Sequence, residues 1–211
     1  APDSGEISVL DIDVCAEPQH VQERLGYMPQ RFGLYEDLTV QENLNLYADL
    51  HGVTIDERRE GYPRLMEMTG LGRFTDRLAG KLSGGMKQKL GLACTLVRSP
   101  ELLLLDEPTV GVDPLSRREL WQIILQLVNE RGLTVLVSTS YLDEAERCGR
   151  VVVLHEGNVL AEGTPVDVSI LAARRTFLAD VHAGERARAL QTRLLDDPDI
   201  VDAVPEGGQV R

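Results

Sequence analysis

The sequence predicts an α/β protein whose core is a parallel β-sheet, and three observations carry this prediction. Segments with strand-like and helix-like patterns alternate between residues 101 and 147, as they do around parallel sheets. Residues 102–105 are all leucine, which fits a strand buried on both faces. Asp106 and Glu107 follow them directly. Open α/β sheets bind ligands beyond the carboxyl ends of their strands, so this acidic pair marks a candidate site.

Composition limits the size of the protein and the class of its partners. The 211 residues, 43% of them hydrophobic, can bury one core and a small appendage. The net charge of -12 argues against nucleic acid as the main partner. No apolar run approaches the roughly 20 residues that cross a bilayer.

Cysteines and histidines indicate no cofactor site. The cysteines are odd in number and widely separated, which suits a reducing cytosol better than disulfides, and we expect buried thiols. The histidines have no metal-ligand spacing, so we expect each at the surface. We expect the single tryptophan, Trp121, in the core. The cysteines and histidines are Cys15, Cys94 and Cys148, and His20, His51, His155 and His182.

Two strands and a helix are predicted in the first quarter of the chain. Residues 7–14 alternate apolar and polar side chains and predict a strand. Residues 24–28 predict a short strand, which places Gln30 at a strand end where a loop can move. Thr39 and Glu42 have the spacing of a capping box and predict the start of a helix.

The remaining elements continue the alternation and then end in a small appendage. A turn at residues 156–158 predicts a closing hairpin between residues 151 and 162. We expect residues 1–175 to form one domain, with helices inserted at about 32–98, and residues 176–211 to start a β-α-β appendage. The other predicted helices are 56–69, 116–131, 141–147 and 185–195, and the other predicted strands are 101–105, 133–138, 176–181 and 200–204.

Ser83, Gly84 and Gly85 open a further predicted helix. At such a start, bare backbone N–H groups and the positive end of the helix dipole can meet a phosphate. Taken alone, the same three residues are equally an ordinary loop with a helix cap.

Five motifs together resemble those of the ATP-binding-cassette (ABC) ATPases. Residues 82–89 (LSGGMKQK) resemble the signature motif, and residues 102–109 (LLLLDEPT) resemble the Walker B motif. Gln30 resembles the glutamine of the Q-loop, residues 111–114 (GVDP) the D-loop, and residues 138–145 (STSYLDEA) the switch region. The resemblance runs from about residue 4 to residue 165, in the order of the family.

The resemblance implies a fold and a function. The fold is a P-loop NTPase-like parallel sheet with an inserted helical subdomain and an incomplete N-terminal β-subdomain. The function is the ATP-binding and ATP-hydrolysing subunit of an ABC transporter, of the drug or ion exporter type, with ATP and Mg²⁺ as cofactors. Its partners are membrane subunits, at the cytoplasmic side of the membrane, and a second nucleotide-binding domain arranged head to tail. The alternatives are an ABC ATPase of DNA repair or translation, and a non-catalytic interaction module.

The resemblance also assigns roles to residues. Asp106 holds Mg²⁺ through its water shell, Glu107 is the general base for the attacking water, and Gln30 touches metal and water. Asp113 lies at the dimer seam, although a plain turn carboxylate is as good a reading of its local sequence. The residues that act on the partner's nucleotide are Ser83, Gly84, Gly85 and Gln88.

Two departures from the family pattern bear on activity. The only Gly-Lys pair, Gly80-Lys81, is followed by Leu82 and lacks the upstream glycine of a Walker A loop. We therefore expect residue 1 to lie just downstream of that loop, and this chain to bind Mg·ATP poorly. Ser140 stands where most members have a histidine that contacts the γ-phosphate. A serine cannot carry positive charge, so the resemblance implies a slow site paired with an active one.

Overall fold

The computed structural model describes residues 4–31, 33–173, 177–181, 186–206 and 208–211. It forms two compact units, Ala1–Ser140 and Tyr141–Arg211, which we describe separately. In the part of the chain that is described, no helix combines the length and the apolar character that a membrane crossing needs.

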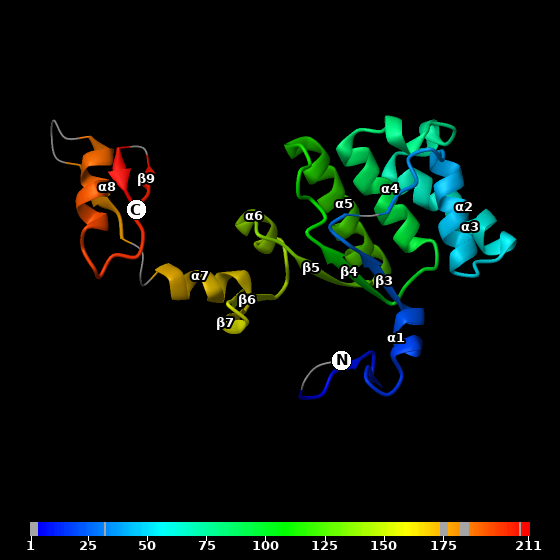
Figure 1. Ribbon diagram of the computed structural model, residues 1–211, viewed down its shortest axis with the longest axis horizontal. Helices are drawn as coiled ribbons and strands as arrows, with labels where there is room; N and C mark the ends of the chain where they lie inside the picture. The colour runs from blue at the N-terminus through cyan, green and yellow to red at the C-terminus, as the bar shows by residue number, and fades with distance from the viewer. Residues whose placement is uncertain (1–3, 32, 174–176, 182–185, 207) are drawn as a thin grey trace. The chain divides into compact units, whose positions relative to one another are not determined.

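The centre of the first unit is the predicted parallel sheet (Figure 1). Strands β3 (Leu25–Met28), β4 (Leu102–Asp106) and β5 (Thr134–Ser138) lie side by side in that order. Both pairs are parallel, and Asp106 lies opposite Ser138. Helix α5 (Pro114–Arg131) connects β4 to β5. All three strands therefore end at the same edge of the sheet, which brings the candidate site together.

Three α-helices are inserted between β3 and β4. They are α2 (Val40–Leu50), α3 (Ile55–Thr69) and α4 (Gly84–Leu96), with 3₁₀ turns η1 (Gly72–Phe74) and η2 (Ala79–Lys81) between α3 and α4. The predicted capping box at the start of α2 is confirmed, since Thr39 and Glu42 make both of its hydrogen bonds. A second capping box, formed by Thr54 and Glu57, opens α3. These caps fix where each helix begins.

Helix α4 is the most buried of the inserted helices. It contacts α2, α3, α5 and β3, and its residues from Leu90 to Leu96 are all buried. At Gly26 of β3 an added Cβ atom would lie 2.9 Å from Cγ2 of Thr95, so glycine permits the close approach of α4 to the sheet. Burial raises the pKa of the Cys94 thiol. Trp121 is 2% exposed, which confirms its predicted place in the core.

The N-terminal segment differs from the prediction. Residues 7–14 form a small hairpin, β1 (Ser8–Val9) and β2 (Ile12–Asp13), instead of one strand. The reason lies in the backbone of Leu10 and Asp11, whose φ angles are 53° and 62°, because two successive left-handed residues make a tight hairpin turn. The sequence analysis also missed α1 (Pro18–Arg24). Cys15 is exposed, so the expectation of a buried thiol was wrong there.

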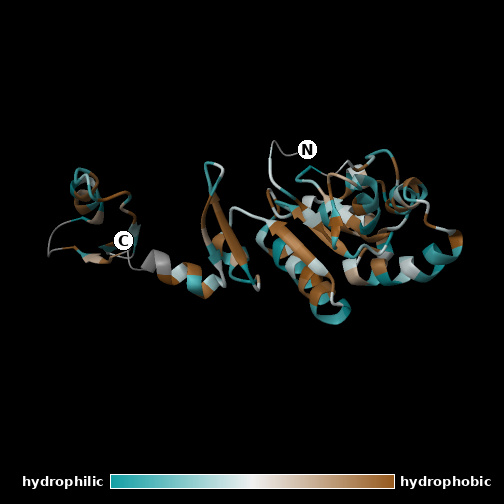
Figure 2. Cartoon of the chain, turned by 90° about the horizontal axis from the view of Figure 1, so that it is seen from below, coloured by the Kyte–Doolittle hydropathy of each residue, from teal (hydrophilic) through white to brown (hydrophobic). Residues whose placement is uncertain are grey.

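The second unit contains the predicted hairpin. After the short helix α6 (Leu142–Ala145), strands β6 (Val151–His155) and β7 (Asn158–Gly163) pair antiparallel. Their apolar residues give the brown colour of this hairpin in Figure 2. Helix α7 (Pro165–Ala173) follows, and it was not predicted.

The appendage has shorter strands than predicted. It contains β8 (Ala179–Asp180), α8 (Ala187–Leu195), β9 (Pro205–Glu206) and β10 (Gln209–Val210), with β10 between the other two strands. The predicted strand at 200–204 was wrong, because the backbone N–H groups of Ile200 and Ala203 bond locally, to the carbonyl of Asp197 and to the side chain of Asp202. Ala203 packs with Leu190 and Val210. The start of the predicted strand at 176 and His182 lie outside the described residues.

Candidate functional site

The predicted site residues fall into two groups, and the first lies at the carboxyl edge of the sheet. Gln30 follows β3, Asp106 ends β4 and Glu107 follows it. The structure joins two of these residues directly, since Nε2 of Gln30 donates a hydrogen bond to Oε2 of Glu107 at 2.5 Å. These two residues are 77 positions apart in the chain. The parallel sheet therefore brings the predicted Q-loop and Walker B residues into contact.

Ser138, the last residue of β5, completes this group, and the sequence analysis did not single it out. Its hydroxyl donates to Oδ1 of Asp106 at 2.6 Å and accepts from the backbone N–H of Glu107 at 2.9 Å. Its backbone oxygen also accepts from that N–H, at 3.2 Å. Ser138 thus bonds to the side chain of Asp106 and to the backbone of Glu107. The sequence signal that could have identified Ser138 was its position at the end of the strand beside β4.

Glu107 adopts an unusual backbone conformation. Its φ angle is 44°, in the left-handed region that residues other than glycine seldom adopt. Such conformations persist where surrounding contacts hold them, and they concentrate at functional sites. The bonds from the Glu107 N–H to Ser138 are contacts of this kind.

The donor chemistry of this group fits Mg²⁺ together with a phosphate. Asp106 offers a carboxylate, and Gln30 uses its amide nitrogen toward Glu107, so its amide oxygen is a possible ligand. Mg²⁺ prefers such oxygen ligands and usually binds through one or two carboxylates plus substrate phosphates. In the described residues, no three histidine, cysteine or acidic side chains are grouped to hold a metal by themselves.

The second group lies at the start of α4 and α5. Ser83 caps α4 and accepts from the N–H of Met86 at 3.3 Å. Asp113 caps α5 and accepts from the N–H of Ser116 at 3.0 Å. The hydrogen bonds with Ser116 lower the pKa of the Asp113 carboxyl. Ser83 is therefore the helix cap that its local sequence predicts. Asp113 is also a helix cap, in place of the turn carboxylate that its local sequence predicts.

The other predicted residues of this surface differ in exposure. Ser83 and Gly84 are exposed, whereas Gly85 is buried and Gln88 is half-buried. Ser140 is exposed at the end of the first unit. Among the residues that the structure describes, its side chain makes no hydrogen bond to Asp106 or Glu107. The structure therefore does not join Ser140 to the first group.

Comparisons with known proteins show which family the chain resembles. A family model described as ABC transporter matches residues 1–110. The chain is 55% identical over 211 residues to the probable multidrug ABC transporter ATP-binding protein YbhF of Escherichia coli strain K12, covering 100% of this chain and 36% of that protein. It is 42% identical over 165 residues to the Nod factor export ATP-binding protein I of Burkholderia thailandensis, covering 78% of this chain and 54% of that protein.

A solved structure extends the similarity to the fold. It is a dimeric ATP-binding cassette in a post-hydrolysis state, bound to ADP and Pi, with a TM-score of 0.67 and 28% sequence identity. The match covers 78% of this chain and 75% of that chain. The predicted P-loop NTPase-like fold is thereby confirmed. This chain spans about a third to a half of the curated relatives' length, namely 36% and 54%.

Proposed function

Since the chain belongs to the ABC transporter family, we propose that it is the ATP-binding and ATP-hydrolysing part of an exporter that powers membrane subunits. The observation that carries the proposal is the meeting of Gln30, Asp106, Glu107 and Ser138 at one edge of the sheet. The relatives named for multidrug transport and for Nod factor export support export as the direction. The acidic net charge of -12 disfavours a role on nucleic acid.

The residues of the first group have complementary tasks in this proposal. Asp106 and Gln30 would hold Mg²⁺, which supplies charge neutralisation between phosphate oxygens when bound. Glu107 accepts the proton of the attacking water as general base. Ser138 fixes the Asp106 carboxylate and the Glu107 backbone through its hydrogen bonds. Gln30 orients the Glu107 carboxylate from a loop that leaves β3.

The second group serves a neighbouring nucleotide in this proposal. Ser83 and Gly84 are exposed at a helix N-terminus, where backbone N–H groups and the helix dipole favour a phosphate. We assign them, with Gly85 and Gln88, to the site of a second nucleotide-binding domain packed head to tail. Asp113 then lies at that seam. The dimeric cassette with a similar fold supports this arrangement.

The wider organisation follows from the same proposal. We assign residues 1–175 to the nucleotide-binding domain, with the helices of residues 32–98 directed to membrane subunits at the cytoplasmic side. Residues 176–211 form the appendage. Ser140 makes this protein's own site the slower of the pair, because serine stabilises developing phosphate charge less than histidine does.

The test is ATP hydrolysis by a form of the protein that carries a Walker A loop, together with its membrane subunits, in lipid vesicles. We expect hydrolysis that requires Mg²⁺ and stops when EDTA is added, accompanied by movement of a substrate across the vesicle membrane. Hydrolysis without any substrate movement would favour an ABC ATPase with no transport role. Absence of nucleotide binding would favour a non-catalytic interaction module.

Ser138 provides a specific prediction within this site. Ser138→Ala removes the donor to Asp106 and one acceptor for the Glu107 N–H. We expect the maximal rate of ATP hydrolysis to fall by about 10- to 100-fold, as is typical when partners that orient metal ligands are removed. Ser138→Thr keeps the hydroxyl and is the matched control. A maximal rate for Ser138→Ala within about twofold of the unchanged protein would remove Ser138 from this role.

A further inference from the structure

The side chain of Ser116 fills the space beside Gly85 of the signature motif. A Cβ atom built on Gly85 would lie 2.2 Å from both Cβ and Oγ of Ser116, far inside the distance that packed atoms keep. Gly85 belongs to α4 and its φ angle is not left-handed, so its backbone would accept alanine. Space, and not conformation, therefore requires glycine at this position.

Neighbouring contacts extend this packing along both helices. A Cβ on Gly84 would lie 4.0 Å from the backbone oxygen of Gly111, which is an ordinary contact. One turn further along α4 and α5, Nζ of Lys89 lies 2.5 Å from Oε2 of Glu119. The first turns of the two helices thus lie against each other, and the Gly85–Ser116 contact is the tightest point.

Ser116 also connects this contact to the loop before α5. Its backbone N–H donates to Oδ1 of Asp113, which caps α5. Asp113 belongs to the residues that resemble the D-loop. A displacement of Ser116 therefore moves the signature motif and the D-loop motif together.

We propose that Ser116 is a positioning residue that sets where the N-terminus of α4 lies. The contact with Ser116 by itself requires glycine at residue 85, whether or not a nucleotide approaches it. Ser83 and Gly84 are exposed and Gly85 is buried, and the proposed function assigns all three residues to a neighbouring nucleotide. Their contact with a phosphate rests on the proposed function, whereas the packing against Ser116 does not.

The test combines the substitutions Gly85→Ala and Ser116→Gly in the full chain. In Gly85→Ala the new methyl group meets Ser116, and we expect the midpoint of thermal unfolding, Tm, to fall by about 4 to 10 °C. Ser116→Gly removes Cβ and Oγ, and a Cβ at residue 85 then meets the Cα of residue 116 at 3.6 Å, an ordinary contact. In the Ser116→Gly background we therefore expect Gly85→Ala to change Tm by less than about 2 °C.

Amide hydrogen exchange locates the effect in the signature motif. We expect Gly85→Ala alone to raise exchange in residues 83–90 by about tenfold, and the added Ser116→Gly to reverse this. Gly84→Ala is the matched control, because its Cβ meets only the Gly111 oxygen at 4.0 Å. It should leave exchange and Tm unchanged in both backgrounds.

The effect of Gly85→Ala in the Ser116→Gly background decides whether the proposal holds. If Gly85→Ala lowers Tm and raises exchange equally with and without Ser116→Gly, Ser116 does not position α4 and the proposal is wrong. Neither measurement requires nucleotide. Failure of ATP binding in a form of the protein that carries a Walker A loop would therefore refute the proposed function without affecting this result.

Discussion

In a form of the protein that carries a Walker A loop, replacing Glu107 by glutamine is expected to slow ATP hydrolysis at this site by about a hundredfold or more while ATP still binds. The amide has the size of the carboxylate but cannot accept the proton of the attacking water. Its oxygen can still accept the hydrogen bond that Gln30 donates to Glu107. The backbone N–H of residue 107 also keeps its bonds to Ser138. The substitution therefore removes the base and preserves the geometry.

Single-turnover hydrolysis at this site measures the effect, with the second site disabled. Glu101→Gln is the matched control, because Glu101 lies just before β4 and pairs with Arg24 through two hydrogen bonds of 2.6 Å. That control should turn over ATP normally. A rate for Glu107→Gln within about a factor of two of the unchanged protein would contradict the assignment of the general base.

The parallel sheet and its acids could be predicted because their signals are local in the sequence. Four leucines ending in Asp106 and Glu107 identify a strand and a site at its carboxyl end. Burial on both faces was predicted, but only Leu103 and Leu105 are buried, whereas Leu102 and Leu104 on the other face are half-buried. Gln30 was found in the same way, from the strand that precedes it and from the order of motifs. The capping box of Thr39 and Glu42 is likewise contained in four residues.

The rest depends on contacts between distant residues or on strained backbone, which a local pattern does not contain. Ser138 reaches Asp106 across 32 positions, and only the register of β4 with β5 sets them opposite each other. The fit of Ser116 beside Gly85 depends on how α4 and α5 pack. The turn at Leu10 requires a left-handed leucine, against its own conformational preference.

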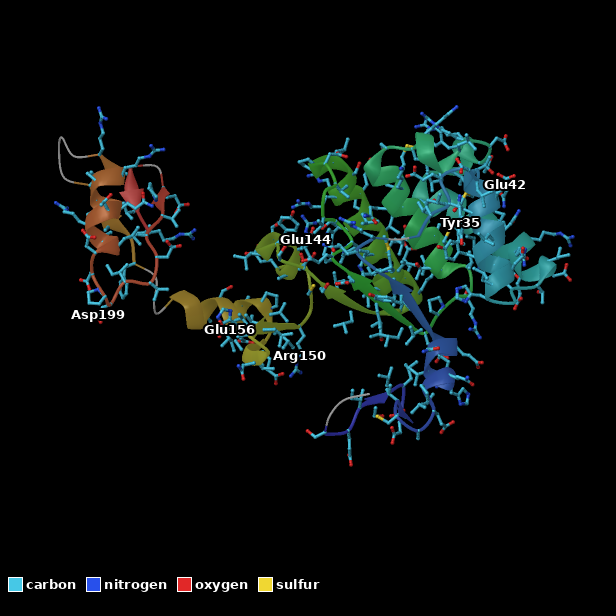
Figure 3. The ribbon with its side chains drawn as sticks, viewed as in Figure 1. Tyr35, Glu42, Glu144, Arg150, Glu156 and Asp199 are labelled. Atoms are coloured by element: carbon cyan, nitrogen blue, oxygen red, sulfur yellow. The ribbon has the colours of Figure 1, made fainter. Side chains whose placement is uncertain are left out.

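Asn43 is a further residue that the sequence did not single out, and its side chain holds the loop between Gln30 and α2. It is fully buried in α2, at 0% exposure. Its Nδ2 donates to the backbone oxygens of Tyr35, Leu38 and Thr39 at 3.0, 3.3 and 2.9 Å, and its Oδ1 accepts from the N–H of Tyr35 at 2.9 Å. Figure 3 labels Tyr35, which precedes α2, and Glu42, which lies in α2.

The partners of Asn43 differ in what they lose when its side chain is removed. Each of the three carbonyl oxygens also accepts a backbone N–H, from Leu38, Ala79 and Asn43 itself. The N–H of Tyr35 has no second partner in the described residues. Asn43→Ala therefore leaves one unsatisfied donor and a small cavity, besides three weakened acceptors. We expect the free energy of unfolding to fall by about 2 to 4 kcal/mol.

Urea denaturation of the full chain measures this loss, and Asn45→Ala is the matched control. Asn45 lies on the same helix, is half-buried, and accepts one bond from Nε2 of Gln41 at 3.1 Å. Its replacement should lower the free energy of unfolding by less than about 1 kcal/mol. Equal losses for the two alanine variants would show that the Asn43 bonds do not hold the loop.

Asn43→Asp separates the hydrogen bonds of Asn43 from its volume. At neutral pH the carboxylate can still accept from the Tyr35 N–H, but it places negative charge against the carbonyl oxygens of Tyr35, Leu38 and Thr39.

Burial and these oxygens raise the pKa of the new carboxyl in the folded state. A carboxyl with a raised folded pKa binds its proton more tightly when folded, so its destabilising effect should shrink as pH falls below that pKa. Relative to Asn43→Ala, the aspartate variant should therefore gain stability between about pH 7 and pH 5, because the protonated acid donates one hydrogen bond. If the difference between the two variants does not change with pH, the three carbonyl oxygens do not face this side chain in solution.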